Sequence, residues 1–434
     1  MEAVEARVED LSHDGCGVVR SRGRAYFIPG ALPGERIRFL PGKRRRRRWS
    51  GQLESIVEPS PDRVEPPCEY FGRCGGCVLQ HAGAGAQRRF KERVLLDNLL
   101  RIGRVRADEV LPPVQGADWQ YRRKARLGIR NVPKKGGTLV GFRERNRHFI
   151  TSLSHCRTLD SRISGLLPGL HTLVSNLSGN HRIPQIEVSA GSRTVDLVLR
   201  HLEPLTAGDR DALERFARES QVNLFLQSAG PDSISRLWPA SPPTPHYRID
   251  RYDLVLEFEA TDFIQVNDEA NQRMVERVIG FLDPVASDAV LDLFCGLGNF
   301  TLAIARSGSR VLGVEGDGAL VSRGKSNARL NQLENVQFQQ LDLFCDDLKP
   351  LWEGRPFNKL LLDPPRSGAF HVVTRLVPEL RPEIIVYVSC NPATLARDAD
   401  QLVHAGGYRF SHVGTIDMFP HTAHIESMAV FRRG

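Results

Sequence analysis

Residues Ala289–Thr301 read Ala-Val-Leu-Asp-Leu-Phe-Cys-Gly-Leu-Gly-Asn-Phe-Thr, an apolar run that passes into a glycine-rich turn. The run has the length of a buried strand, and the residues after the turn are compatible with a helix. A lone Gly-x-Gly is weak evidence for a nucleotide site, and the third glycine of a dinucleotide fingerprint is absent. The stretch therefore predicts a Rossmann-like α/β sheet, while its ligand has to be inferred from the strands that follow.

The later predicted strands of this sheet are each followed by a polar residue. Glu315 follows Val311–Val314, Asp342 comes shortly after Val336–Gln340, and Asp363 follows Lys359–Leu362. Carboxyl ends of parallel strands share one edge of the sheet, where doubly wound folds bind their ligands. A carboxylate at the place of Glu315 can accept hydrogen bonds from ribose hydroxyl groups. The pattern predicts nucleoside binding by a C-terminal domain, residues 246–434.

A fifth predicted strand, Ile384–Ser389, is followed by Cys390 and then by the turn residues Asn391 and Pro392. A thiolate at the ligand-binding edge is well suited to add to an electron-poor ring. Free cysteine is also among the most buried residue types, so the alternative is a structural core residue. The neighbouring stretches favour the chemical role.

Length and cysteine usage limit the class of protein. The 434 residues suffice for about three domains, and no apolar run approaches the length of a membrane span. The acidic start is unlike a secretory or transit peptide, so we expect a cytoplasmic protein without a membrane partner. In that compartment the eight cysteines favour metal ligation, catalysis or core packing over a disulfide framework.

Positive charge is concentrated in two windows. Residues 20–48 carry eleven Lys and Arg against one acid, and residues 122–147 carry ten against one. Two basic blocks ahead of an otherwise acidic chain indicate a polyanionic partner, with nucleic acid the obvious candidate. For Lys43–Trp49 alone, a solvated loop is the alternative.

Residues 1–60 predict a small OB-like β-barrel, because five short strand-like runs between residues 4 and 58 are separated by Gly and Pro turns. Such barrels bind nucleic acid with a basic face and a few aromatic residues, here Tyr26, Phe27 and Trp49. In pattern and charge the stretch resembles a TRAM domain, an RNA-binding barrel that occurs in several RNA-modifying enzymes.

Residues 61–245 predict a central α+β domain with a metal site. Three cysteines fall within ten residues of a glycine-rich loop, at Cys68, Cys74 and Cys77. A fourth ligand is needed, and Cys156 or the isolated Cys16 could supply it. Four cysteines suit either a [4Fe–4S] cluster or structural zinc, and spacing alone leaves both open.

The remainder of this domain predicts packing and RNA contacts. Gln87–Ile102 has the apolar stripe of an amphipathic helix, to which we assign packing. Basic strands follow over residues 119–150, with Trp119, Tyr121 and Phe142 among the positive charges, as suits a surface that neutralises phosphates and stacks bases. The Pro-rich stretch Trp238–Pro245 predicts the boundary before the last domain.

Four motifs occur in a characteristic order, beginning at Asp292 (DLFCGLGNF), Asp363 (DPPR), Val388 (VSCNP) and Pro420 (PHTAHIE). Together they resemble the RNA uracil-C5 methyltransferase family, which uses S-adenosylmethionine. With the barrel-like start and the four cysteines, the resemblance covers nearly the whole chain and points to the iron–sulfur branch that acts on 23S ribosomal RNA. It implies a [4Fe–4S] cluster on Cys68, Cys74, Cys77 and Cys156, and cofactor contacts from Gln265, Phe294, Asn299, Glu315, Asp342 and Asp363.

The chemistry explains the catalytic residues that the resemblance implies. Uracil C5 is too weak a nucleophile to take a methyl group unaided, so Cys390 would add to C6 and make C5 nucleophilic. A base must then remove the C5 proton, and Glu426 is the candidate, with a salt-bridged surface residue as the alternative. His421 and His424 are expected to be structural. The target uridine has to leave its stack, which explains the long RNA-binding portion of the chain.

Other functions share parts of this pattern. A transfer RNA uracil-C5 methyltransferase would carry the same catalytic motifs, but the barrel and the four cysteines favour 23S ribosomal RNA. A DNA cytosine-C5 methyltransferase is disfavoured, because its nucleophile lies in a Pro-Cys dipeptide and Cys390 follows Ser389. A non-catalytic RNA-binding iron–sulfur protein is disfavoured by the presence of both Cys390 and Glu426. No obligatory protein partner is implied.

Overall fold

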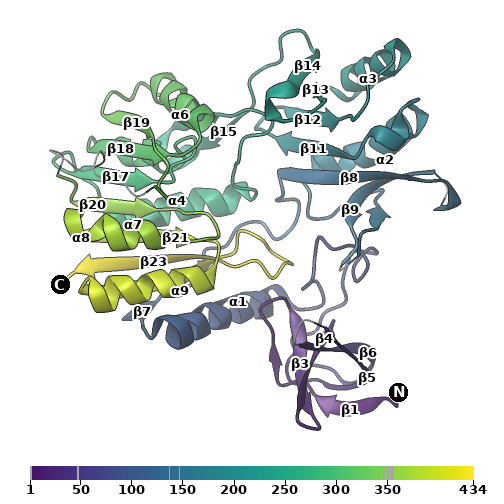
Figure 1. Ribbon diagram of the computed structural model, residues 1–434, viewed down its shortest axis with the longest axis horizontal. Helices are drawn as coiled ribbons and strands as arrows, with labels where there is room; N and C mark the ends of the chain where they lie inside the picture. Colours follow the sequence, from purple (N-terminus) through teal and green to yellow (C-terminus); the bar gives the residue numbers. More distant parts are fainter. Residues whose placement is uncertain are drawn as a thin grey trace.

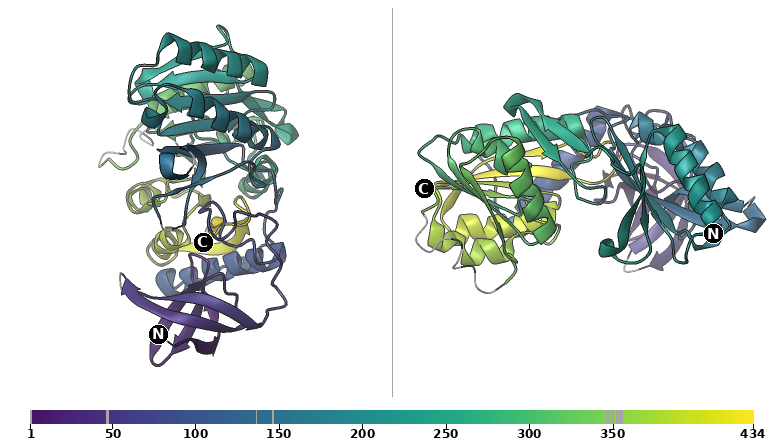
Figure 2. Two further views of the ribbon diagram at one scale, coloured as in Figure 1. Left: turned by 90° about the vertical axis from the view of Figure 1, so that its right-hand side faces the viewer. Right: turned by 90° about the horizontal axis from the view of Figure 1, so that it is seen from above.

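The computed structural model describes residues 2–45, 48–135, 137–145, 147–345, 348, 351 and 356–434. In this part of the chain the strands form sheets of six, seven and eight strands and one two-stranded hairpin. Figure 1 shows the six N-terminal strands at one end of the molecule, with the seven-stranded sheet and the eight-stranded sheet beyond them, and Figure 2 shows the same arrangement from two further sides. None of the described helices combines the length and hydrophobicity that crossing a bilayer requires.

The N-terminal sheet contains the strands expected between residues 4 and 58, in the order β1-β5-β6-β4-β3-β2. They are β1 (Val4–Arg7), β2 (Asp10–Leu11), β3 (Cys16–Ser21), β4 (Arg24–Pro29), β5 (Arg36–Arg45) and β6 (Arg48–Glu58). Of the arginine run 44–48, Arg46 and Arg47 lie outside the described residues. Tyr26 does not face RNA as expected. It is 5 % exposed and packs against Phe39, with ring centroids 5.3 Å apart, because alternate residues of β4 enter the core of this sheet.

The seven-stranded sheet has the order β10-β9-β8-β11-β12-β13-β14 and shares one core with two helices. Its strands are β8 (Lys124–Val132), β9 (Gly137–Arg143), β10 (Ile150–Ser152), β11 (Gln185–Ala190), β12 (Val195–Arg200), β13 (Asn223–Gln227) and β14 (Ile234–Trp238), and the helices are α2 (Ser161–Asn176) and α3 (Ala207–Ser220). Each helix begins at an expected type of cap, since Asp160 accepts from the Arg162 N–H and Thr206 forms a capping box with Asp209.

The eight-stranded sheet has the order β19-β18-β17-β20-β21-β23-β22-β7. All five expected strands are present as β17 (Ala289–Leu293), β18 (Arg310–Glu315), β19 (Val336–Gln340), β20 (Lys359–Leu362) and β21 (Ile384–Ser389), and they run parallel. Beyond them lie β23 (Glu426–Arg433), β22 (Tyr408–Ile416) and β7 (Glu109–Val110), with β23 antiparallel to both of its neighbours. The hairpin β15 (His246–Ile249) and β16 (Leu254–Glu257) packs beside this sheet against helix α6 (Gly318–Leu330).

Both faces of the eight-stranded sheet are covered. Successive residues of β21 alternate between two hydrophobic cores, as Tyr387 and Val388 do, because side chains along a strand point to opposite faces. One core includes residues of α4 (Asp268–Leu282), α5 (Thr301–Ala305) and α6 (Gly318–Leu330). The other includes residues of α1 (Ala84–Asn98), α7 (Phe370–Arg375), α8 (Val377–Leu380) and α9 (Pro392–Asp400).

Helix α1 and strand β7 belong to the expected central domain by sequence but pack on the C-terminal sheet (Figure 1). The α-helix spans Ala84–Asn98, and Leu99–Gly103 form a π-helical turn. The helix expected over residues 87–102 is therefore present, but it begins at Ala84 and its last residues are π-helical. The division at residues 60 and 245 itself stays a prediction.

Candidate active site

A cavity of about 590 Å³ lies at the carboxyl ends of β17, β18, β20 and β21. The eight residues predicted to bind the cofactor or to act on the substrate all line it. They are Gln265, Phe294, Asn299, Glu315, Asp342, Asp363, Cys390 and Glu426. The topology brings them together because parallel strands end at one edge of the sheet.

Cys390 and Glu426 reach this cavity from neighbouring strands. Cys390 directly follows β21, and Glu426 is the first residue of β23. The two strands are antiparallel with Ser389 opposite Ser427, so one further step of the register places Cys390 opposite Glu426. Both side chains line the cavity, and the charge of Glu426 contributes to the raised pKa of the Cys390 thiol. Strand pairing therefore brings the thiol and the carboxyl group together.

Burial and mutual repulsion shift the ionisation of these groups. Burial raises the pKa of Glu426 to about 8, the charge of Asp363 adds to this, and the Arg366 guanidinium opposes it. Burial raises the pKa of Asp363 to about 7, with a further contribution from Glu315. The pKa of the Cys390 thiol rises to about 11, because it is buried and lies near Glu426 and Asp363. A cation bound among these groups would favour their ionised forms.

The carboxylates at two strand ends are held by backbone amides. Glu315 accepts hydrogen bonds from the N–H groups of Gly296 (3.1 Å) and Asp317 (3.0 Å). Asp342 accepts from the Phe344 N–H (2.9 Å). A carboxylate has about four acceptor sites, so Glu315 and Asp342 keep capacity for a ligand. The glycine-rich turn passes below them through left-handed conformations at Phe294 (φ 63°) and Gly298 (φ 100°), and an added Cβ at Gly298 would come within 3.1 Å of Leu302 and Phe338.

Asn299 lines the cavity, but its amide is already paired inside the protein. Its Oδ1 accepts from the Tyr247 hydroxyl (3.0 Å) and from the Asn271 amide (3.0 Å), and its Nδ2 donates to Asn271 Oδ1 (3.0 Å). These bonds join the glycine-rich turn to α4 and β15. Tyr247 was not identified from the sequence, because nothing in its neighbourhood marks it as a site residue.

A second cavity, of about 480 Å³, adjoins the first and shares Arg366, Cys390, His424 and Ile425 with it. The rest of its wall includes residues from the N-terminal half of the chain: His13 and Asp14 before β3, Gly75, Gly76 and Val78 of the cysteine loop, and Val94 and Asn98 of α1. Cys390 thus lies where two cavities meet. Helix α1, to which only packing was assigned, is part of the site, a relationship that hydrophobic periodicity cannot reveal.

The four cysteines line a separate small cavity. Cys68, Cys74, Cys77 and Cys156 all border it, whereas Cys16 lies elsewhere, with its Sγ 3.4 Å from Arg145 Nη2. Burial raises the pKa of Cys77 to about 12, and the nearby Cys156, Cys74 and Cys68 thiols add to this shift. In the ranges that the structure describes, no group of three or more His, Cys, Asp or Glu residues is placed so that it could hold a metal ion.

Two aromatic residues expected to stack RNA bases contact the protein instead. Trp119 stacks on His421 with ring centroids 3.7 Å apart. Tyr121 is 6 % exposed, and its hydroxyl donates to the Pro420 carbonyl (2.9 Å). Both residues therefore contact the segment that precedes Glu426. Sequence composition alone could not distinguish this packing role from stacking on RNA bases. Phe142 packs against the core of the seven-stranded sheet and borders the four-cysteine cavity.

Comparisons with known proteins agree with this site. Residues 245–433 match a family model described as tRNA (Uracil-5-)-methyltransferase. A protein of Xanthomonas oryzae pv. oryzae named 23S rRNA (uracil(1939)-C(5))-methyltransferase is 48% identical over 432 residues, which cover 99% of this chain and 97% of that protein. The chain belongs to the RNA uracil-C5 methyltransferase family. Family members of the same name in Nitrosospira multiformis (98% of each chain) and Alkalilimnicola ehrlichii (100% of this chain, 97% of the relative) are 47% and 46% identical.

A solved structure of this family resembles the whole chain. The tRNA (uracil-54, C5)-methyltransferase of Pyrococcus abyssi, in complex with S-adenosyl-L-homocysteine, superposes with a TM-score of 0.76 over 99% of this chain and 100% of that chain. Because the identity is 23%, this likeness concerns the fold, which is multidomain in both. The predicted family membership and methyltransferase fold are confirmed. The barrel type, the cluster and the roles of individual site residues stay predictions.

Proposed function

We propose that this enzyme transfers a methyl group from S-adenosylmethionine to C5 of a uridine in 23S ribosomal RNA. The observation that carries the proposal is the opposition of Cys390 and Glu426 on neighbouring strands, inside a cavity lined by the strand-end carboxylates. The relatives that are 46 to 48% identical are named for uridine 1939 of 23S ribosomal RNA, and this supports that RNA and that uridine as the substrate. This substrate implies action in the cytoplasm.

The first cavity suits the cofactor in shape and charge. Glu315 and Asp342 present carboxylates toward a nucleoside, and Phe294 and Phe344 lie together, with ring centroids 5.8 Å apart, on the same wall. Asp363 and Glu426 make the interior acidic, which favours a cationic sulfonium. S-adenosylmethionine, when bound, supplies the electrophilic methyl group.

In the proposed reaction, the Cys390 thiolate adds to uracil C6 and the electrons of the C5–C6 double bond move onto C5 and O4. C5 would then take the methyl group, while the bond from that methyl to the sulfonium sulfur would break and leave the neutral thioether S-adenosylhomocysteine. The ionised Glu426 removes the C5 proton, the C5–C6 double bond forms again, and the sulfur leaves as a thiolate. Arg366 opposes the rise in pKa of both Cys390 and Glu426 and so favours the ionised forms that these steps require.

We place the target nucleotide at the second cavity, since it opens onto Cys390 from the side of the N-terminal half. Reaching Cys390 requires the uridine to leave its stack. Arg126 and Arg130 are exposed on β8, where each follows a buried residue, and could contact the phosphate backbone. The six N-terminal strands would act as a TRAM-like, OB-like RNA-binding barrel, because His13 and Asp14 border the same cavity.

We further propose a structural [4Fe–4S] cluster on Cys68, Cys74, Cys77 and Cys156. All four thiols border one cavity, and hydrogen bonds of the kind found at cluster ligands are present: Gly76 N–H to Cys74 Sγ (3.4 Å), and the contact between Cys156 Sγ and the Thr158 hydroxyl (3.3 Å). Structural zinc is the competing occupant of a four-cysteine site.

The function is tested by mapping 5-methyluridine in 23S ribosomal RNA from cells with and without this protein. We expect one methylated uridine to disappear, and the purified enzyme to restore it on RNA from the deficient cells. Methylation of transfer RNA with an unchanged 23S RNA would show that the enzyme is a transfer RNA uracil-C5 methyltransferase. An unchanged pattern in both RNAs would contradict the proposal.

A further inference from the structure

The loop formed by residues 417–425 joins β22 to β23 and ends directly before Glu426. Figure 1 shows it extending from the C-terminal sheet toward the N-terminal half of the molecule. His424 and Ile425 border both cavities, Phe419 borders the first, and Thr422 borders the second. Loop 417–425 is therefore a wall shared by the two cavities that meet at Cys390.

A buried lysine of α1 holds the first part of this loop. Lys91 is 1% exposed, and its Nζ donates to Asp417 Oδ1 (2.7 Å) and to the Phe419 carbonyl (2.8 Å). Asp417 is 3% exposed. A buried ammonium group is costly unless it is paired and hydrogen-bonded, so this lysine is tied to loop 417–425 by the charge it carries.

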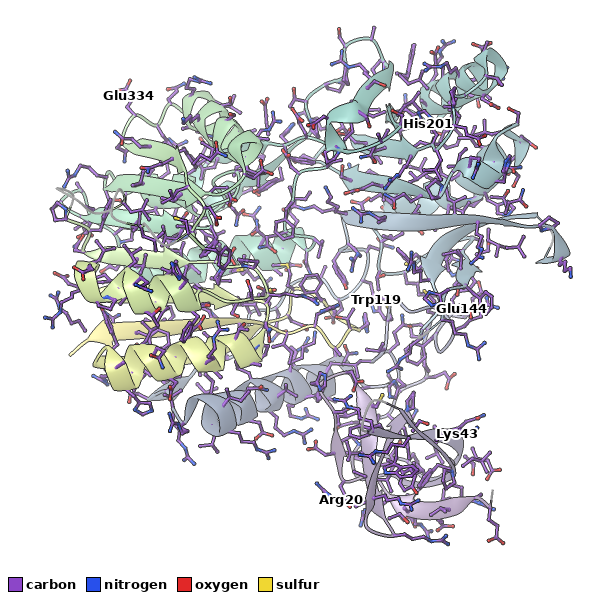
Figure 3. All side chains as sticks on the ribbon, viewed as in Figure 1. Arg20, Lys43, Trp119, Glu144, His201 and Glu334 are labelled. Atoms are coloured by element: carbon purple, nitrogen blue, oxygen red, sulfur yellow. The ribbon has the colours of Figure 1, made fainter. Side chains whose placement is uncertain are left out.

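The middle of loop 417–425 is fixed at His421. Its N–H donates to Gln87 Oε1 (2.7 Å), and its carbonyl accepts from the N–H groups of Val78 (2.9 Å) and Leu79 (3.0 Å). The His421 backbone has φ 65°, an uncommon conformation for a residue other than glycine, which persists where surrounding contacts impose it. Figure 3 shows Trp119, which stacks on the His421 ring, near the end of this loop.

These supports all come from residues 78–121, whereas Cys390 is placed by β21 in the middle of the C-terminal sheet. We propose that Lys91 and Gln87 are positioning residues, which hold loop 417–425 so that the target base is aligned with Glu426. The inference rests on the proposed function, in which Glu426 is the base. Loosening the loop should therefore slow removal of the C5 proton while leaving addition of the thiolate nearly unchanged.

The experiment is a single-turnover assay of the full-length enzyme with ribosomal RNA and S-adenosylmethionine labelled in the methyl group. A denaturing gel separates labelled RNA from the labelled protein–RNA adduct, so formation and breakdown of the adduct are both measured. For Lys91→Met we expect breakdown to slow by about tenfold or more, because small misalignments of reacting groups are costly, and the adduct to accumulate. Adduct formation and RNA affinity should stay within about twofold of wild type, since neither depends on this alignment.

Arg89→Met is the matched control. Arg89 lies on the same helix but pairs with Asp62 (2.6 Å), both side chains being largely exposed, so its loss should change neither rate. Gln87→Leu removes the acceptor of the His421 N–H without removing a charge, and it carries the same expectation if Lys91→Met fails to fold.

Equal slowing of formation and breakdown, or wild-type breakdown in a folded variant, would overturn the inference. Glu426→Gln, assayed in parallel, separates the two proposals. If its adduct accumulates and that of Lys91→Met does not, the base assignment stands and the positioning role fails. If Glu426→Gln turns over normally, the base assignment fails, and slowed breakdown in Lys91→Met would still support alignment by loop 417–425.

Discussion

Cys390 and Glu426 flank the last antiparallel pair of β21 and β23, Ser389 with Ser427, and both line the cavity at the ligand-binding edge of the sheet. Because β23 runs antiparallel to β21, the first residue of β23 lies at the same edge of the sheet as the carboxyl end of β21. If β23 were parallel to β21, its first residue would lie at the opposite edge. The reversal at β23 therefore brings the proposed nucleophile and the proposed base to the same edge of the sheet. A pyrimidine held between them can be attacked at C6 by one and deprotonated at C5 by the other.

The two groups should fail differently when removed. Cys390→Ala should bind RNA but form neither adduct nor product, because no thiolate adds to C6. Glu426→Gln should form a methylated adduct that breaks down about a hundredfold or more slowly, since general-base catalysis is lost. Labelled adduct on a denaturing gel distinguishes the two, and the double variant should show none. Wild-type turnover of Cys390→Ala would make Cys390 a core residue and the mechanism wrong.

Glu426 should make folding depend on pH. Burial and the charge of Asp363 raise its pKa to about 8, so the folded protein binds this proton more tightly than the unfolded chain does. The resulting stabilisation is complete below the ordinary pKa of glutamate and is lost as the pH rises through about 8. Glu426→Gln cannot ionise and should not show this loss.

We therefore expect the free energy of unfolding of Glu426→Gln, relative to wild type, to rise between about pH 5 and pH 8, by at most about 1.4 kcal/mol per pH unit. Denaturant unfolding without S-adenosylmethionine measures it. The exposed Glu334 gives the control variant Glu334→Gln, which should show no such trend. A pH-independent difference for Glu426→Gln would show that this carboxyl is not held neutral by its surroundings.

Glu315→Gln should weaken S-adenosylmethionine binding by roughly 1–3 kcal/mol, because a charged acceptor for ribose hydroxyl groups is lost. The amide would also present a donor where a carboxylate oxygen now accepts from Gly296 or Asp317. Calorimetry of the apo-protein measures the affinity, with Glu334→Gln as the control, because Glu334, labelled in Figure 3, is exposed and does not line the cavity. Equal affinity would remove Glu315 from the cofactor site.

Protein purified without oxygen should contain iron and acid-labile sulfide in a ratio near one, at about four of each per chain for a [4Fe–4S] cluster. Cys156→Ser should lose most of both, whereas Cys16→Ser should keep them, because Cys16 does not border the four-cysteine cavity. Elemental analysis and the visible absorption spectrum report the outcome. One zinc ion per chain without sulfide would show that the four cysteines bind structural zinc and not a cluster.

Replacing Arg44–Arg48 with Ser should weaken RNA binding and reduce the slope of log affinity against log salt, since each phosphate contact releases counterions. S-adenosylmethionine affinity should not change. Arg210 and Arg215 lie exposed on α3, away from both cavities, and their replacement by Ser is the control. An unchanged salt slope would mean that the arginine run, whose described residues belong to the paired strands β5 and β6, makes no phosphate contacts.

The sequence by itself predicted the parallel part of the fold and eight residues that line the first cavity. The strands β17, β18, β20 and β21 are short, mainly apolar runs that a turn or polar residue ends, so hydrophobic pattern located these strands and their carboxyl edge. Order along a parallel sheet then required Glu315, Asp363 and Cys390 to share that edge, and all three line one cavity. These conclusions depend on local pattern and on a general rule of topology.

Only the tertiary structure decided how distant segments complete the site. The pairing of β23 with β21 opposes Glu426 to Cys390, and the contacts of Lys91 and Gln87 with loop 417–425 span more than 300 residues of sequence. Tyr26, Trp119 and Tyr121 have the composition of an RNA-stacking surface, yet their rings are engaged within the protein. Local sequence constrains secondary structure. Contacts between residues far apart in the sequence depend on how whole helices and strands pack, and the energy of that packing cannot be derived from any single stretch of sequence.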